Sequence, residues 1–94
     1  MELPPFPPAG ATLPDGTPIT GAEISLTTDD DAQDVGPFWF CFLAGGEPWG
    51  DLPVYAPSPD DAQTSARRLG DLFRAALERG GYPPVTITTR AGRC

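Results

Sequence analysis

A single amphipathic helix is the feature that most limits how this chain can fold, and residues 59–79 carry it. Ser58 can cap the helix, Pro59 suits its first position, and the Gly80-Gly81 pair supplies a stop. The apolar residues of the segment form one stripe at helical spacing: Ala62, Ala66, Leu69, Phe73, Ala76 and Leu77. Such a stripe must pack on another layer, and the rest of the chain predicts strands.

Four other segments carry the patterns of β-strands. Residues 22–28 and 85–88 alternate apolar and polar side chains, whereas residues 38–43 are apolar on both faces, as expected of a central strand. A short strand is expected at 52–56, after a turn-rich loop at 45–50. The predicted fold class is therefore α+β: a small single-layer antiparallel sheet in the order β-β-β-α-β, with one helix packed on one face.

The beginning of the chain differs in composition. Residues 1–20 hold six of the 13 prolines, which exclude a helix and favour an extended arm. Because 94 residues allow one small domain, we predict a Pro-rich arm at 1–20 and a single α+β domain at 21–94. The longest apolar run, residues 38–44, is far shorter than the roughly 20 residues that cross a bilayer, so no membrane contact is expected.

Strand alternation divides the sheet into two faces. The face under the helix is expected to hold Ile24, Leu26, Phe38, Phe40, Phe42, Val54, Val85 and Ile87. The opposite face is expected to gather Ser25, Thr27, Trp39, Cys41, Leu43, Tyr55, Thr86 and Thr88. Because one helix covers one face, this second face is an aromatic patch in a polar frame, as in recognition surfaces. A protein partner, the arm with Phe6 against Trp39, or a second copy in a homodimer would cover it.

Charge and residue content exclude several classes of function. The chain has 13 Asp and Glu against six Arg, with no Lys or His, and a formal charge of −7. Such a surface repels nucleic-acid phosphates, so a protein with a basic surface is the better partner. Without His or any nucleotide-binding or nucleophile motif, we predict no enzyme activity, no catalytic residue and no cofactor. Asp34 stands where a calcium loop beginning at Asp29 needs Gly, so no metal site is predicted.

The two cysteines are too few for a dense disulfide framework. Cys41 lies in the most hydrophobic stretch of the chain and is expected to be a buried free thiol. No charged-then-apolar leader precedes the cysteines. We therefore expect a reduced, cytoplasmic protein.

These features predict a small acidic, non-enzymatic protein-binding module. We expect an inhibitor of the kind that phages or mobile elements use to occlude a basic or nucleic-acid-binding surface of a host protein. The predicted partner-binding residues are Trp39, Leu43, Tyr55, Trp49, Asp29, Asp30, Asp31 and Asp34. An alternative from another class is a structural or assembly component, a virion part or complex subunit, whose Pro-rich arm straps a neighbouring subunit.

A family resemblance suggests a further alternative. The run Ser58-Pro59-Asp60-Asp61-Ala62 opens the helix, and the element order around it resembles the small sheet-and-helix domain of HicB-type antitoxins over residues 22–90. The DNA-binding segment that those antitoxins usually carry has no counterpart in this pattern. The resemblance implies a HicB-like antitoxin domain.

Overall fold

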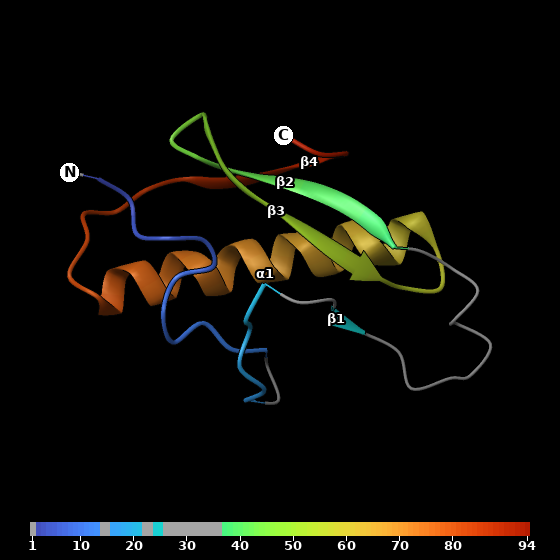
Figure 1. Ribbon diagram of the computed structural model, residues 1–94, viewed down its shortest axis with the longest axis horizontal. Helices are drawn as coiled ribbons and strands as arrows, with labels where there is room; N and C mark the ends of the chain where they lie inside the picture. Colours follow the sequence, from blue (N-terminus) through green and yellow to red (C-terminus); the bar gives the residue numbers. More distant parts are fainter. Residues whose placement is uncertain (1, 14–15, 22–23, 26–36) are drawn as a thin grey trace.

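In the computed structural model, a four-stranded sheet packs on one long helix (Figure 1). The structure describes residues 2–13, 16–21, 24–25 and 37–94. The elements in chain order are β1 Ile24–Ser25, β2 Phe38–Ala44, β3 Glu47–Tyr55, α1 Pro59–Arg79 and β4 Ile87–Ala91. The predicted α+β class and the β-β-β-α-β order are confirmed.

The strands lie in the order β1-β3-β2-β4. β2 is antiparallel to both of its neighbours, β3 and β4, and these three strands form the antiparallel sheet that the sequence predicts. The two-residue β1 adds to the outer side of β3 in parallel, with Ile24 opposite Val54. Because β3 and β4 run in the same direction on either side of β2, α1 is the long crossover that parallel strands require.

β2 and β3 join in a tight hairpin. Gly45 and Gly46 separate the two strands and have positive φ values of 60° and 86°, which glycine adopts without strain. The predicted loop at 45–50 is therefore wrong beyond Gly46, because the strand resumes at Glu47. The turn is as short as an antiparallel connection allows.

A β-bulge in β3 changes the side on which Trp49 lies. Phe42 pairs with Gly50 and Leu43 with Pro48, which leaves Trp49 without a partner on β2. An extra residue of this kind interrupts the alternation of a strand. Trp49 consequently packs against the hydrophobic core under the helix.

α1 begins and ends where the sequence predicts. The Ser58 hydroxyl accepts a 3.2 Å hydrogen bond from the backbone N–H of Asp61, and Pro59 is the first helical residue. The last helical residue is Arg79, before Gly80. No helix in the described part of the chain is long and apolar enough to cross a membrane.

The core lies between the sheet and α1, and all six residues of the predicted helical stripe are buried in it. The predicted core-facing strand residues that are also buried are Ile24, Phe40, Phe42 and Val54. Phe38 and Ile87 pack at the margin of this core. Val85 precedes β4, and Leu26 lies outside the described residues. The register predicted from alternation is therefore confirmed for β2 and β3.

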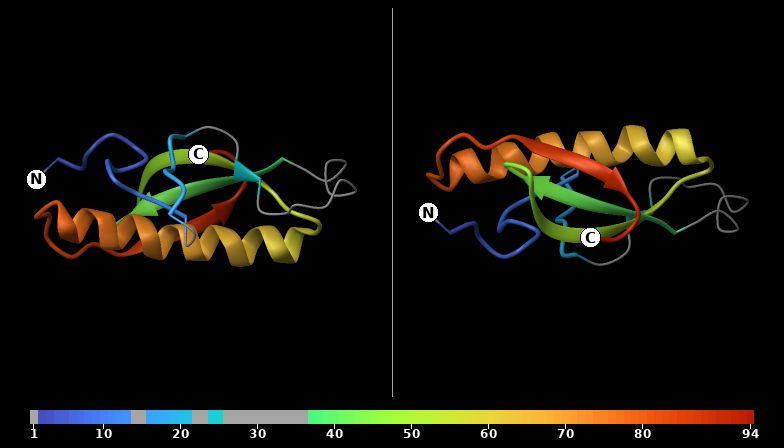
Figure 2. Two further views of the ribbon diagram at one scale, coloured as in Figure 1. Left: turned by 90° about the horizontal axis from the view of Figure 1, so that it is seen from below. Right: turned by 90° about the horizontal axis from the view of Figure 1, so that it is seen from above.

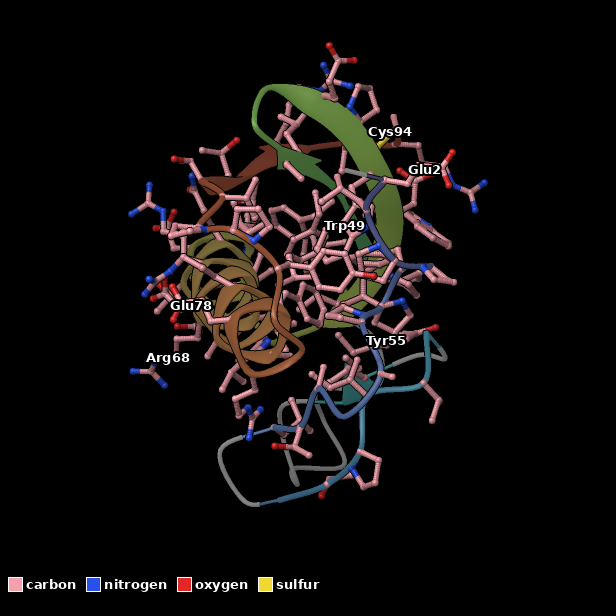
Figure 3. The ribbon with its side chains drawn as sticks, turned by 90° about the vertical axis from the view of Figure 1, so that its left-hand side faces the viewer. Glu2, Trp49, Tyr55, Arg68, Glu78 and Cys94 are labelled. Atoms are coloured by element: carbon pink, nitrogen blue, oxygen red, sulfur yellow. A yellow bond between two sulfur atoms is a disulfide. The ribbon has the colours of Figure 1, made fainter. Side chains whose placement is uncertain are left out.

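The arm lies beside α1, on the same side of the sheet (Figure 2, left). The ring centre of Phe6 lies 5.0–5.3 Å from those of Phe42, Trp49 and Phe73. The Trp49 indole N–H donates a 2.9 Å hydrogen bond to the Pro4 carbonyl. Trp49 is thus held between the arm and the core (Figure 3).

Further along the arm, Ala11 and Ile19 are buried in the same core. The backbone N–H of Ile19 donates a 2.9 Å hydrogen bond to the Ala11 carbonyl, which holds this part of the arm together. The alternative in which Phe6 covers Trp39 is wrong, because the apolar residues of the arm pack on the helix side of the sheet.

Two glycines offer a matched test of this packing. A Cβ at Gly50 would lie 2.8 Å from the Cβ of Phe6 and nearer still to its ring, whereas a Cβ at Gly70 would meet Ile87 Cγ2 at an ordinary 3.4 Å. Gly50→Ala is expected to displace the arm and to lower the free energy of unfolding by about 1–3 kcal/mol. Gly70→Ala is expected to raise it by up to about 1 kcal/mol, because alanine favours the helix.

Urea denaturation of the two variants at low micromolar concentration, followed by tryptophan fluorescence, measures both effects. A Gly50→Ala protein as stable as the wild type would show that Phe6 does not need the space above this strand.

Candidate functional site

The face of the sheet opposite α1 holds the side chains that alternate with the core residues of β2, β3 and β4. By this alternation and the strand register, the helix-free face consists of Trp39, Cys41, Leu43, Pro48, Asp51, Pro53, Tyr55, Thr88 and Arg90. Three predicted binding residues, Trp39, Leu43 and Tyr55, belong to it, and each is half-buried. These three therefore come together on one surface.

A short tail, residues 92–94, folds over part of the helix-free face. The backbone N–H of Gly92 donates a 2.7 Å hydrogen bond to the Trp39 carbonyl. The guanidinium carbon of Arg93 lies 3.8 Å from the centre of the Trp39 ring, in a cation–π contact. The backbone N–H of Cys94 donates a 2.6 Å hydrogen bond to Asp51 Oδ1. The tail thus partly covers Trp39 with a charged group rather than with an apolar one.

A disulfide joins Cys41 to Cys94 across 53 positions of sequence. The prediction of a free thiol is therefore wrong, although Cys41 is fully buried as expected. Apolar neighbours in the sequence indicate burial, but they cannot show that the chain returns to this face at residue 94. The expectation of a reduced protein rested on a free thiol and loses that support.

Asp51 lies beside the disulfide. Together with Cys41 and Cys94 it makes the one group of three residues in the described part of the chain that could ligate a metal. One donor atom from each of Cys41, Asp51 and Cys94 lies within 4.8 Å of the others. Metals bind thiolates, and in the disulfide neither sulfur is a thiolate. In this state the Asp51 carboxylate instead holds the tail through the backbone of Cys94.

The acidic residues are unevenly distributed. The described residues include all six arginines and seven of the 13 acidic residues, which gives them a net charge of −1. The other six acidic residues, at positions 15, 23, 29, 30, 31 and 34, lie outside the described residues. The helix-free face and its tail are themselves mixed in charge, with Asp51, Arg90 and Arg93.

The predicted acidic cluster of Asp29, Asp30, Asp31 and Asp34 lies outside the described residues. The described residues on either side of it are anchored close together, because Ser25 pairs with Tyr55 and Phe38 pairs with Val54. Ser25 and Phe38, the described strand residues before and after this stretch, therefore both lie beside the end of β3.

Trp49 does not join the other predicted binding residues, because the bulge and the contact with Phe6 hold it on the helix side. The sequence reasoning missed Asp51, Arg93 and Cys94, which border or cover Trp39 and Cys41. The sequence held one indication of this arrangement. Cys41 is predicted to lie on the face that the helix leaves uncovered, and Cys94 is the only other cysteine in this chain with which it could form a disulfide.

Removing the disulfide should loosen the tail. Cys94→Ser is expected to lower the free energy of unfolding by about 2–4 kcal/mol, because the bond closes a loop of 53 residues in the unfolded chain. Without this anchor Arg93 should leave the Trp39 ring more often, so that acrylamide quenches Trp39 fluorescence more strongly. A Trp49→Phe background makes Trp39 the only tryptophan.

The control for this prediction is reduction. Wild-type protein in a thiol reductant should approach the stability of Cys94→Ser, and Cys94→Ser should not respond to the reductant. Equal stability of the wild type with and without reductant would contradict the expected role of the disulfide.

No protein-family model, curated protein or solved structure matches this chain. The resemblance to HicB-type antitoxins therefore stays a prediction from element order and the helix cap. The features that bear on function are the helix-free face, its tail and the uneven distribution of charge.

Proposed function

We propose that this chain is a small acidic, non-enzymatic protein-binding module that docks through its helix-free face. The observation that carries the proposal is the grouping of Trp39, Leu43 and Tyr55 on one face of the sheet, opposite α1. Aromatic residues are enriched at protein interfaces, where they fill the centre of the contact. The other aromatic cluster, around Phe6, is committed to the core.

The Arg93–Trp39 pair supports this proposal. Tryptophan and arginine are the residue types that most often contribute strongly to binding at interfaces. The disulfide and the Asp51 hydrogen bond hold the tail in place before any partner arrives. A surface that is ordered in advance loses less conformational entropy when it binds.

The acidic stretch at 29–34 would supply the electrostatic part of recognition. Most of the net charge of −7 comes from residues in this stretch and at positions 15 and 23. Charges of one sign speed the encounter with an oppositely charged surface more than they hold the complex. A partner with a basic surface fits this pattern. Occlusion of such a surface would inhibit a host protein that binds nucleic acid, as a phage or mobile-element inhibitor does.

The disulfide bears on the predicted cytoplasmic location. Cytosolic thiols are normally kept reduced, so the Cys41–Cys94 bond fits an oxidising compartment better. Trp39, Leu43 and Tyr55 belong to β2 and β3, so their grouping does not depend on the bond. The proposed binding face would therefore form both in the reducing cytosol and in an oxidising compartment.

The structural alternative, in which the arm straps a neighbouring subunit, has less support. Phe6, Ala11 and Ile19 of the arm pack in the chain's own core. An arm that reached a neighbour would have to withdraw these side chains.

The proposal predicts a tryptophan-dependent complex. Wild-type protein should capture a stoichiometric partner from host lysate at low and at high salt, and Trp39→Ala should speed dissociation from that purified partner about 30-fold or more, as loss of an interface hot spot does. Arg68→Ala, on the exposed side of α1 (Figure 3), is the matched control and should leave dissociation unchanged.

Surface plasmon resonance with the purified partner measures these rates. Trp49→Ala should mainly lower stability, because this side chain packs between the arm and the core. Equal dissociation rates for Trp39→Ala and the wild type would rule out the helix-free face as the docking surface.

A second prediction concerns the acidic stretch. Replacing Asp29, Asp30, Asp31 and Asp34 together by Asn should slow association and flatten its dependence on salt, while dissociation changes little. Stopped-flow association rates between about 0.05 and 0.5 M NaCl test this expectation. If the salt dependence is the same in the variant and the wild type, the acidic stretch does not guide the encounter.

A further inference from the structure

Two sulfur atoms and one carboxylate converge on the helix-free face. Cys41 on β2 and Asp51 on β3 lie directly opposite each other in the β2–β3 register. Cys94 reaches this pair from the tail, on the side of the sheet away from α1 (Figure 3). One donor atom from each of the three residues lies within 4.8 Å of the others. A metal ion needs donors grouped in this way, but in the disulfide both sulfurs are bonded to each other.

Reduction of the disulfide would turn both sulfurs into possible ligands. A dithiol reductant supplies two electrons, the S–S bond breaks, each sulfur takes up a proton, and the reductant itself becomes a disulfide. Two of the three ligands do not depend on the bond for their positions, because Cys41 is fully buried in β2 and Asp51 is half-buried beside it in β3. The hairpin therefore keeps one sulfur and one carboxylate together in the reduced chain.

Contacts that do not involve sulfur keep Cys94 near this pair. The backbone N–H of Gly92 bonds to the Trp39 carbonyl, and Arg93 lies over the Trp39 ring. The backbone N–H of Cys94 also donates to Asp51 Oδ1. This bond leaves Oδ2 for a metal, and carboxylate ligands are commonly oriented by a hydrogen bond of this kind. The tail is looser without the disulfide, but its third ligand stays within reach.

We propose that the reduced chain binds one Zn²⁺ through the sulfurs of Cys41 and Cys94 and a carboxylate oxygen of Asp51. Zinc binds sulfur at about 2.3 Å and carboxylate oxygen at about 2.0–2.2 Å, so that tetrahedral ligands lie roughly 3.5–3.8 Å apart. A small shift of Cys94, which is exposed, provides this spacing. Both thiols release their protons when zinc binds, and the fourth position is open to water.

The set of donor atoms favours zinc over the commoner divalent cations. Mg²⁺ and Ca²⁺ take six or more oxygen ligands, whereas thiolates select zinc and similar softer metals. Two thiolates and a carboxylate bring three negative charges, which Arg90, opposite Cys41 on β4, and Arg93, next to Cys94, partly offset. The site is also separate from the acidic stretch at 29–34, whose spacing does not fit a calcium loop.

The zinc site would act on the same tail as the disulfide. In a reducing compartment zinc would hold Cys94 against β2 and β3, as the covalent bond does in an oxidising one. Arg93 would then stay over Trp39 in both conditions. This inference does not rest on the proposed protein-binding function, because the three ligands are present whether or not a partner binds the face.

Zinc titration tests the site directly. The full chain, reduced with a phosphine that adds no competing thiol, should bind one Zn²⁺ in competition with a chromophoric chelator. Native mass spectrometry should show a single zinc ion on a monomer. The oxidised chain should bind none, and Mg²⁺ in about tenfold excess should not displace zinc from the reduced chain.

Three variants assign the ligands. Asp51→Asn is expected to raise the dissociation constant for zinc about tenfold or more, because a neutral amide can still accept the Cys94 N–H but is a poor zinc ligand. Cys94→Ser should raise it about a hundredfold or more, since a thiolate is lost. Asp71→Asn, an exposed carboxylate on α1, is the matched control and should change it by less than about twofold. Circular dichroism checks that every variant is folded.

Trp39 fluorescence gives a second readout, again in a Trp49→Phe background. Zinc added to the reduced chain should lower acrylamide quenching of Trp39 toward the value of the oxidised chain, and it should not change quenching in Cys94→Ser.

Three outcomes would overturn the proposal. The first is a reduced, folded chain that binds no zinc. The second is one zinc ion shared between two chains, which would show that the cysteines bind it between molecules. The third is an Asp51→Asn protein that binds zinc as tightly as the wild type, which would show that two thiols bind the metal without the site.

Discussion

A sheet of four strands is wider than one helix, and the rest of this fold depends on what covers the part of the sheet that the helix leaves open. Neighbouring strands lie about 4.8 Å apart and a helix is about 10 Å across, so α1 covers only about half of the sheet. It lies toward β4, and the arm covers the side of β3 (Figure 2, left). Phe6 fills the space between them, against rings from β2, β3 and α1. Gly50 has no side chain, and this lets Phe6 lie directly on the strand.

Both ends of the described chain therefore contribute to a small domain. A domain of this size buries a smaller share of its surface than a larger one, and extra connections compensate for this. The arm adds Phe6 and Ile19 to the core on one face, and on the other face the tail is held by a disulfide at Cys94. The two additions differ in kind. The arm contributes apolar area, whereas the tail contributes a covalent bond and leaves an arginine over Trp39.

Local signals were sufficient to predict much of this structure. The cap, the apolar stripe and the glycine stop lie within or next to α1, so its limits could be predicted to the residue. Alternation placed Phe40 in the core and Trp39 on the opposite face. The position of Phe6 and the partner of Cys41 depend on segments more than 30 residues apart, which no local pattern relates. Trp49 lies between these cases, because nothing in residues 45–50 indicates the bulge that turns it toward the core.

The helix-free face and the β4 edge share one strand but use different groups of it. Thr88 and Arg90 direct their side chains to the face, whereas the backbone of the alternate residues faces the edge. A homodimer formed face to face would bury Trp39 and remove the surface proposed for the partner.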